Sequence, residues 1–271
     1  MDTRPIGVFD SGLGGLTAVR SLRRILPEED LVYFGDTARV PYGGRSRETI
    51  LQYARQDVRF LRSFDPKAVV IACGTISTTS LDILRTENDV PFVGVVDPAC
   101  GRALSVTRAK RVGLIATLAS VRSGAYDAAL RRLDPAVEIF AQPCPLFVPL
   151  VENGRFQRGD IVVETVAREY LTPLKERGID TLILGCTHYP LLWDVIGDVC
   201  GPEVSLVSAG EESAFALKRL LKERDLRTDP ARQGSTRFYV SDRAEDFERI
   251  ASVFLGEDLR RTAQRIDIDR Y

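Results

Sequence analysis

The sequence predicts an α/β protein: two similar α/β domains whose mostly parallel sheets face each other across a central cleft. Short, continuous apolar runs alternate with longer segments of helical periodicity, which is typical of parallel sheets covered by helices on both faces. The 271 residues are enough for one large or two modest domains. Two apolar runs of the second half also resemble two runs of the first half.

Strands and helices alternate along the whole chain. In order, the continuous apolar runs predict strands at 6–9, 31–34, 68–72, 91–96, 111–115, 139–141, 181–184, 204–207 and 238–240. Between them, helical patterns cover 16–26, 47–64, 74–85, 123–132, 160–176, 211–222 and 244–254.

The repeat between the two halves is faint but points to one edge of each sheet. Residues 6–11 resemble residues 112–117, and residues 68–75 resemble residues 181–188 at nearly the same spacing. In each half the later strand ends in a cysteine. Because ligands of open α/β sheets bind beyond the carboxyl ends of the strands, two facing halves would bring both cysteines to one cleft.

The composition excludes several classes of protein. Lys and Arg number 37 and Asp and Glu 38, so there is no basic surface for nucleic acid or an anionic membrane. No apolar run approaches the roughly 20 residues of a membrane helix, and the N-terminus lacks a secretory signal. Five cysteines without a C-x-x-C pair are typical of reduced cytosolic thiols. We therefore expect a cytoplasmic protein that binds neither nucleic acid nor a membrane.

Cys73 and Cys186 end the two matching strands, and each is followed within two residues by a threonine. A helix N-terminus lowers a thiol pKa from its usual value of about 8.5 and can hold a carboxylate. Most free cysteines are small buried packing residues, which remains the alternative. The matched placement favours a functional pair. Cys100, Cys144 and Cys200 have no such context and are interpreted as packing residues.

Two glycine-rich loops follow predicted strands. The stretch FDSGLGGL fits only two of the three glycines of a dinucleotide fingerprint, and Asp10 would repel a phosphate. It is either a tight turn or a site where Asp10 assists a proton transfer and Ser11 contacts a polar ligand. The stretch VPYGGRS places Tyr42 and Gly43 in a loop. Its bare N–H groups could bind a carboxylate, and the alternative is a surface turn.

Two further ionisable residues stand near apolar segments. Glu152 is either a catalytic auxiliary or a helix-start charge. His188, the only histidine, lies two positions after Cys186. One histidine and scattered cysteines argue against a tetrahedral zinc site. A Cys–His hydrolase with Cys186 as nucleophile remains open, but it leaves Cys73 without a role.

The motifs FDSGLGG, VPYGGRS, IACGT, VPLVENG and LGCTHYPLL occur in this order. Together they resemble the motifs of the glutamate racemases in the cofactor-independent aspartate/glutamate racemase superfamily. The resemblance runs from residue 6 to about 221 and continues more weakly over 237–256. The resemblance implies a first domain of residues 1–97 and 208–271 and a second of 98–207. It also implies interconversion of L- and D-glutamate, which supplies D-glutamate for peptidoglycan. The substrate is the only ligand implied, with neither cofactor nor metal, and a homodimer is compatible with it.

The same resemblance implies a role for each candidate. Cys73 would remove the α-proton of D-glutamate and Cys186 that of L-glutamate, the opposite thiol giving a proton to the other face. Asp10 would assist Cys73, His188 would assist Cys186, and Glu152 matches an acid implicated in the family. The positions that match substrate-binding residues are Ser11, Tyr42, Gly43, Gly74, Thr75, Thr117, Ser120 and Thr187.

General chemistry agrees with two thiols, but one position departs from the family pattern. Inverting a stereocentre needs a base on one face and an acid on the other, and two equivalent groups suit a reversible reaction. Only one thiol can be ionised at a time, so a coupled titration is expected. The family usually has an asparagine where this chain has Gly74, and losing one such hydrogen bond costs about 0.5–1.5 kcal/mol. Gly74 therefore leaves open a racemase of the same superfamily that acts on aspartate or another amino acid. A glutamate-binding protein that has lost catalysis is a separate alternative, against which the intact Cys73, Cys186, Asp10 and His188 argue.

Overall fold

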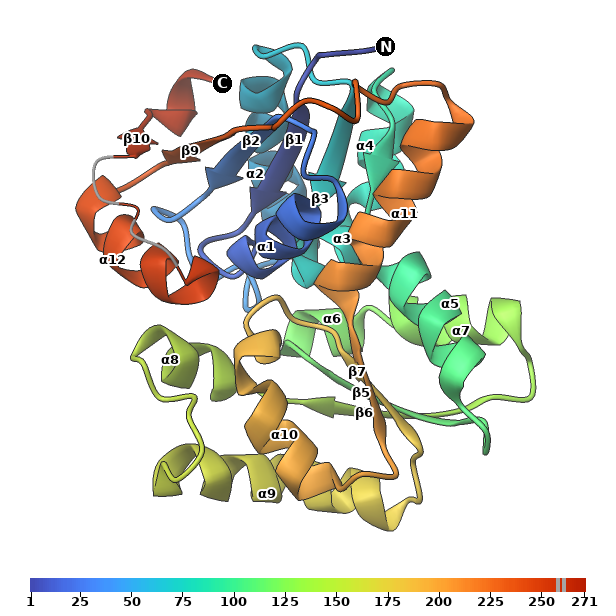
Figure 1. Cartoon of the computed structure of the whole chain (residues 1–271). Helices are drawn as coiled ribbons and strands as arrows, with labels where there is room; N and C mark the ends of the chain where they lie inside the picture. Colours follow the sequence, from blue (N-terminus) through green and yellow to red (C-terminus); the bar gives the residue numbers. More distant parts are fainter. Residues whose placement is uncertain (257–258, 260–261) are drawn as a thin grey trace.

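The computed structural model describes residues 1–256, 259 and 262–271, and its strands form two sheets (Figure 1). The larger sheet, in the order β10-β9-β2-β1-β3-β4, contains β1 (Ile6–Asp10), β2 (Leu31–Gly35), β3 (Ala68–Ile71), β4 (Phe92–Val93), β9 (Thr236–Val240) and β10 (Ala263–Arg265). The smaller sheet, in the order β6-β5-β7-β8, contains β5 (Arg111–Ala116), β6 (Glu138–Pro143), β7 (Thr181–Leu184) and β8 (Ser205–Ser208). The pairings between described strands are all parallel, which confirms the predicted fold class.

Helices cover both sheets, and one of them links the two halves. The larger sheet carries α1 (Leu16–Ile25), α2 (Arg47–Arg62), α3 (Gly74–Thr79), α4 (Leu81–Glu87), α11 (Ala209–Glu223), α12 (Ala244–Leu255) and the short 3-10 helix η2 (Ile268–Arg270). The smaller sheet carries α5 (Val96–Val106), α6 (Leu118–Arg122), α7 (Ala125–Leu133), α8 (Phe147–Glu152), α9 (Ile161–Glu176), the 3-10 helix η1 (Tyr189–Leu192) and α10 (Trp193–Cys200). Helix α11 packs against both α1 and α5, so it contacts helices of both halves (Figure 1).

Four inner strands are buried along their whole length. All residues of β1, β2, β3 and β7 are buried, as expected of parallel strands with helices on both faces. Ile6 of β1 pairs with Leu31 of β2 and with Ala68 of β3. This register brings Asp10, the last residue of β1, to the same sheet edge as the chain that leaves β3.

The structure corrects the predicted strand at 91–96. Only Phe92 and Val93 pair with β3, and Val96 already begins α5, which continues to Val106 and was not predicted. A proline and a glycine within this segment obscured the helix. Pro98 is tolerated because it lies in the first turn, where no intrahelical N–H bond is lost.

Other short elements were also missed or merged. The predicted helix over 74–85 is two helices, α3 and α4, which meet at Ser80. Helices α6, α8 and α10 and the edge strand β10 were not predicted, and each is too short to show a clear hydrophobic period. Within the described residues, no helix has the length and apolar character needed to cross a membrane.

A buried ion pair ties four segments together at the amino ends of the larger sheet. Lys67 Nζ lies 2.6 Å from Glu29 Oε2, and the two side chains are 0% and 1% exposed. The same ammonium group donates to the carbonyl oxygen of Asp2, and the other oxygen of Glu29 accepts the N–H of Thr228. A charge left alone at this depth would be strongly unfavourable.

We therefore expect Lys67→Met to lower the free energy of unfolding by about 3–5 kcal/mol, because it leaves the Glu29 carboxylate buried without its counter-charge. Chemical denaturation measures this difference. The control is Arg55→Met, which breaks the solvent-exposed Arg55–Glu87 pair and should leave the free energy of unfolding nearly unchanged. Equal losses in the two variants would contradict this account of the Lys67 pair.

Candidate active site

Side chains at the carboxyl ends of the two sheets hydrogen-bond to one another. Thr75, in the first turn of α3, lies with its Oγ1 3.1 Å from Oγ1 of Thr117, which follows β5. Thr17 of α1 donates its hydroxyl to the carbonyl oxygen of Thr187 at 2.8 Å. Thr187 in turn donates its hydroxyl to Asp10 Oδ1 at 3.5 Å. The strand ends that carry the two candidate cysteines thus belong to one site.

Two glycines allow this close approach. A Cβ atom on Gly74 would overlap with the carbonyl oxygen of Gly185, the residue before Cys186. A Cβ atom on Gly14 would overlap with the side chains of Thr187 and His188. The chain therefore needs glycine at both positions if the two halves are to keep their present separation.

Cys73 is buried at the start of α3, and its partner is a hydroxyl. Its Sγ lies 3.2 Å from Oγ of Ser11, which follows β1. Burial, and next the charge of Asp10, raise the pKa of Cys73 to about 12, although hydrogen bonds from Ser11 and from the N–H of Ile76 act in the opposite direction. The lowered thiol pKa expected from the helix N-terminus is therefore wrong for Cys73: removal from water outweighs the short helix. The group is a proton-bearing thiol at neutral pH.

Asp10 lies between the two halves. Its Oδ2 accepts the N–H of Gly12 at 3.0 Å, and its Oδ1 accepts the hydroxyl of Thr187. Burial raises the pKa of Asp10, opposed by the charge of His188 and by N–H groups of the glycine loop. Among the described residues it makes no hydrogen bond to Cys73, so it acts on that thiol through its charge while Ser11 makes the contact.

Cys186, His188 and Glu152 form a row on the opposite side. Cys186 Sγ is 3.9 Å from Nδ1 of His188, and Nε2 of the same ring is 3.0 Å from Oε1 of Glu152. Glu152 is the last residue of α8, so its interpretation as a helix-start charge is wrong. Burial lowers the pKa of His188, but hydrogen bonds and charge interactions with Cys186 and Glu152 outweigh it and raise that pKa to about 10. The imidazole is thus protonated at neutral pH.

The remaining predicted residues fall into two groups. Thr117 caps α6, where its Oγ1 accepts the N–H of Ser120 and donates to Oγ of Ser120 at 3.0 Å, so both hydroxyls lie beside Thr75. Gly43 lies near Thr117, since a Cβ atom on it would meet the threonine Cβ at 3.4 Å. Tyr42 differs, because its hydroxyl is donated to Asp36 and not to a neighbouring site residue.

Sequence reasoning missed the residues behind Tyr42. Asp36, Arg39 and Asp57 form a cluster in which both carboxyl groups are fully buried. The available signal was Asp57, a charge on the otherwise apolar face of the predicted helix 47–64.

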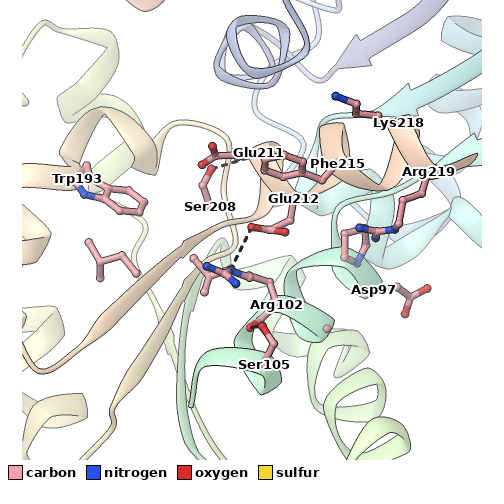
Figure 2. A pocket seen from close by; sticks show the side chains of 14 residues that line it. Asp97, Arg102, Ser105, Trp193, Ser208, Glu211, Glu212, Phe215, Lys218 and Arg219 are labelled. Carbon is pink, nitrogen blue, oxygen red and sulfur yellow. Dashed lines mark hydrogen bonds and ion pairs between the residues drawn. The ribbon is translucent and has the colours of Figure 1, made fainter. Parts of the chain in front are cut away.

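A pocket of 840 Å³ lies elsewhere in the molecule, between α5, α10 and α11 (Figure 2). Figure 2 shows Arg102 and Glu212 paired beside it, with Trp193 and Phe215 on its walls. None of its lining residues is a predicted site residue. The candidate active site is therefore assigned from its chemistry and not from the size of a cavity.

Known proteins resemble this chain over nearly its whole length. The sequence profile of the Asp/Glu/Hydantoin racemase family matches residues 7–214. The chain is 46% identical to a glutamate racemase of Geobacter metallireducens over 259 residues, which is 96% of this chain and 95% of that protein. It is similar to the solved structure of glutamate racemase isoform RacE1 from Bacillus anthracis, with a TM-score of 0.94, 35% identity and 98% of each chain covered. It is also similar to the solved structure of a glutamate racemase from Francisella tularensis in complex with D-glutamate, with a TM-score of 0.91, 38% identity and 100% of each chain covered.

The contacts of His188 with Cys186 and Glu152 lead to a prediction about this ring, which is the only histidine of the chain and can be followed by NMR. We expect His188 to titrate at about 10, and Glu152→Gln to lower that pKa because an amide does not balance the charge of the ring. Because the folded-state pKa is raised above 6.5, the protonated ring contributes stability below that pH, and the contribution is lost as the pH rises toward about 10.

The matched control is Glu138→Gln, which removes a carboxylate from the surface pair with Arg111 on β5 and β6 and should leave His188 unchanged. Titration of the wild-type ring near its ordinary value of 6.5 would contradict the assignment.

Proposed function

The chain belongs to the Asp/Glu/hydantoin racemase family and is an amino-acid racemase, and we propose that it interconverts L- and D-glutamate with Cys73 and Cys186 as the two proton-transferring groups. The observation that carries the proposal is the placement of the two thiols. Each follows a central strand of its own sheet, and the residues next to them, Gly74 and Gly185, are in contact. Two such groups on opposite sides of a bound amino acid can act on opposite faces of its α-carbon.

In the proposed reaction, the α-proton moves to one sulfur while the other sulfur gives a proton to the opposite face. With D-glutamate, Cys73 takes the proton as a thiolate and Cys186 donates as a thiol; with L-glutamate the roles are exchanged. One proton therefore leaves the carbon and one returns, and the enzyme ends with its proton on the other cysteine. Buried hydrogen bonds must stabilise the carbanion, because no cofactor takes up the charge.

The surroundings of the two thiols suit these roles in different ways. The protonated His188, held by Glu152, can hydrogen-bond to the sulfur of Cys186 and stabilise it as a thiolate, which Cys186 is before it takes a proton from L-glutamate and after it gives one in the opposite direction. On the other side, Ser11 hydrogen-bonds to Cys73, and we propose that the charge of Asp10 favours transfer of the substrate's α-proton to that sulfur, because it raises the thiol pKa.

We propose that the backbone and the hydroxyl groups around the thiols bind the substrate. The proposed binding residues are Ser11, Tyr42, Gly43, Gly74, Thr75, Thr117, Ser120 and Thr187. Tyr42 contributes through its loop, because its hydroxyl is donated to Asp36. Gly74 offers an N–H in place of a side-chain amide, and its contact with Gly185 gives a reason for the missing side chain.

The wider context follows as part of the same proposal. The enzyme supplies D-glutamate for peptidoglycan in the cytoplasm, where its cysteines stay reduced, and it forms a homodimer. It needs neither a metal nor pyridoxal phosphate. The division into domains 1–97 plus 208–271 and 98–207 is supported by sheet membership, since β9 and β10 follow β8 in the chain but lie in the larger sheet.

The activity test uses purified enzyme without added cofactor and chiral chromatography of the products. We expect D-glutamate from L-glutamate, and Cys73→Ser and Cys186→Ser should each lower the rate at least about 1,000-fold, because a hydroxyl is a far weaker acid than a thiol. Cys200→Ser, at the buried end of α10, is the control and should keep the activity. If the wild-type enzyme formed no D-glutamate, the proposal would be refuted. Faster racemisation of aspartate than of glutamate would show that aspartate is the preferred substrate.

The contact between the halves predicts the effect of one added methyl group. Gly74→Ala should lower kcat/KM by about 100-fold, because its Cβ must push Gly185 and the neighbouring Cys186 away from Cys73 by an appreciable part of an ångström. Gly101→Ala inside α5 is the control, since its Cβ would meet nothing within 4 Å. Unchanged kinetics in Gly74→Ala would show that the contact does not set the separation of the thiols.

A further inference from the structure

A buried polar cluster lies behind the loop that contains Tyr42. Asp36 follows β2, Asp57 belongs to α2, and both are 0% exposed. Arg39 lies between them with a side chain that is 12% exposed, and Tyr42 is buried as well. The proposed reaction assigns no task to the two carboxyl groups or to the arginine.

Asp36 receives three donors within this cluster. Its Oδ2 accepts Nε of Arg39 at 2.6 Å and the hydroxyl of Tyr42, and its Oδ1 accepts the hydroxyl of Ser241 at 2.8 Å. Ser241 follows β9, so these bonds join the loop to two strand ends of the larger sheet. A carboxylate with several donors fixes the position of each of them.

Asp57 is much less involved. Its Oδ1 accepts Nη2 of Arg39 at 3.0 Å, while its Oδ2 has no hydrogen-bond partner within the part of the chain that the structure describes. Burial, and next the charge of Asp36, raise the pKa of Asp57 well above its usual value. One guanidinium thus faces two carboxyl groups, and Asp36 accepts more hydrogen bonds than Asp57 does.

The loop held by this cluster faces the active site. The N–H groups of Gly43 and Gly44 are not donated to any group among the described residues. Gly43 approaches Thr117 across the boundary between the two halves. Adjacent free N–H groups form a natural site for a carboxylate, provided that the loop is held in place.

We propose that Asp36 is a positioning residue: through Tyr42 and Arg39 it holds the Gly43–Gly44 backbone where its N–H groups bind a carboxylate of the substrate. Tyr42 is then a link between Asp36 and the loop, and its hydroxyl does not touch the substrate. Asp57 partners Arg39 without fixing the loop. This inference rests on the proposed racemase function.

The test compares the same isosteric change at two equally buried carboxyl groups. Asp36→Asn should raise KM for both glutamate enantiomers by about 10- to 100-fold, the effect of losing charged hydrogen bonds, with a smaller change in kcat. Asp57→Asn should leave KM within about twofold, because Oδ1 of Asp57 accepts only from Arg39 and its Oδ2 has no hydrogen-bond partner among the described residues. Equal KM values in the two variants, or a loss confined to kcat, would overturn the proposal. Wild-type enzyme without racemase activity would instead defeat the proposed function.

A second pair of variants covers the case in which Asp36→Asn does not fold. Tyr42→Phe removes only the hydroxyl that bonds to Asp36, and should raise KM by about tenfold. Tyr53→Phe is the control, because its ring lies 5.4 Å from that of Tyr42 and its hydroxyl makes no hydrogen bond among the described residues. Equal KM values in these two variants would overturn the proposal.

The double variant separates a link from a direct ligand. If Tyr42 acts through Asp36, Asp36→Asn with Tyr42→Phe should show no higher KM than Asp36→Asn alone. Multiplied effects would show that the hydroxyl of Tyr42 binds the substrate itself, which would overturn its role as a link.

Discussion

The contact between Gly74 and the carbonyl oxygen of Gly185 is the constraint on which the active site depends. Each glycine adjoins one of the two cysteines, so the distance between the two halves at this point sets the distance between the thiols. The hydrogen bonds from Thr75 to Thr117 and from Thr17 to Thr187 hold the same boundary from either side. A two-base reaction needs this precision, since a proton must leave one face of a carbon atom and arrive at the other.

The two sides of the site are alike in topology but not in their electrostatics. Cys73 has a neutral hydroxyl partner in Ser11 and the buried charge of Asp10 nearby, and its pKa is raised to about 12. Cys186 has a protonated imidazole whose charge is balanced by Glu152. The enzyme thus offers a thiol as acid on one side and a histidine-assisted sulfur on the other, while the direction of turnover decides which of them acts as base.

Much of this arrangement could be predicted from the sequence, and the failures have physical causes. Continuous apolar runs correctly predicted the fold class. The internal repeat predicted that Cys73 and Cys186 lie at matching strand ends, as the structure shows. Helix α5 was missed because Pro98 and Gly101 obscure its period, while tertiary packing makes it stable. The prediction of a lowered pKa for Cys73 was wrong because the burial that raises this pKa depends on tertiary packing, which the local sequence does not show. Arg39 and Tyr42 lie in the same loop as Asp36, but Ser241 and Asp57 come from distant segments, so no local pattern could reveal the whole cluster.

The fate of the α-proton in the first turnovers tests the central claim most directly. L-glutamate is incubated with wild-type enzyme in deuterated water, and the reaction is stopped at low conversion. Two bases predict D-glutamate that carries deuterium at the α-carbon, together with recovered L-glutamate that keeps its original proton, because the group that removes the proton is not the group that returns one. D-glutamate that retains the substrate's own α-proton would show that one group does both, and would contradict the assignment of Cys73 and Cys186 as two separate bases.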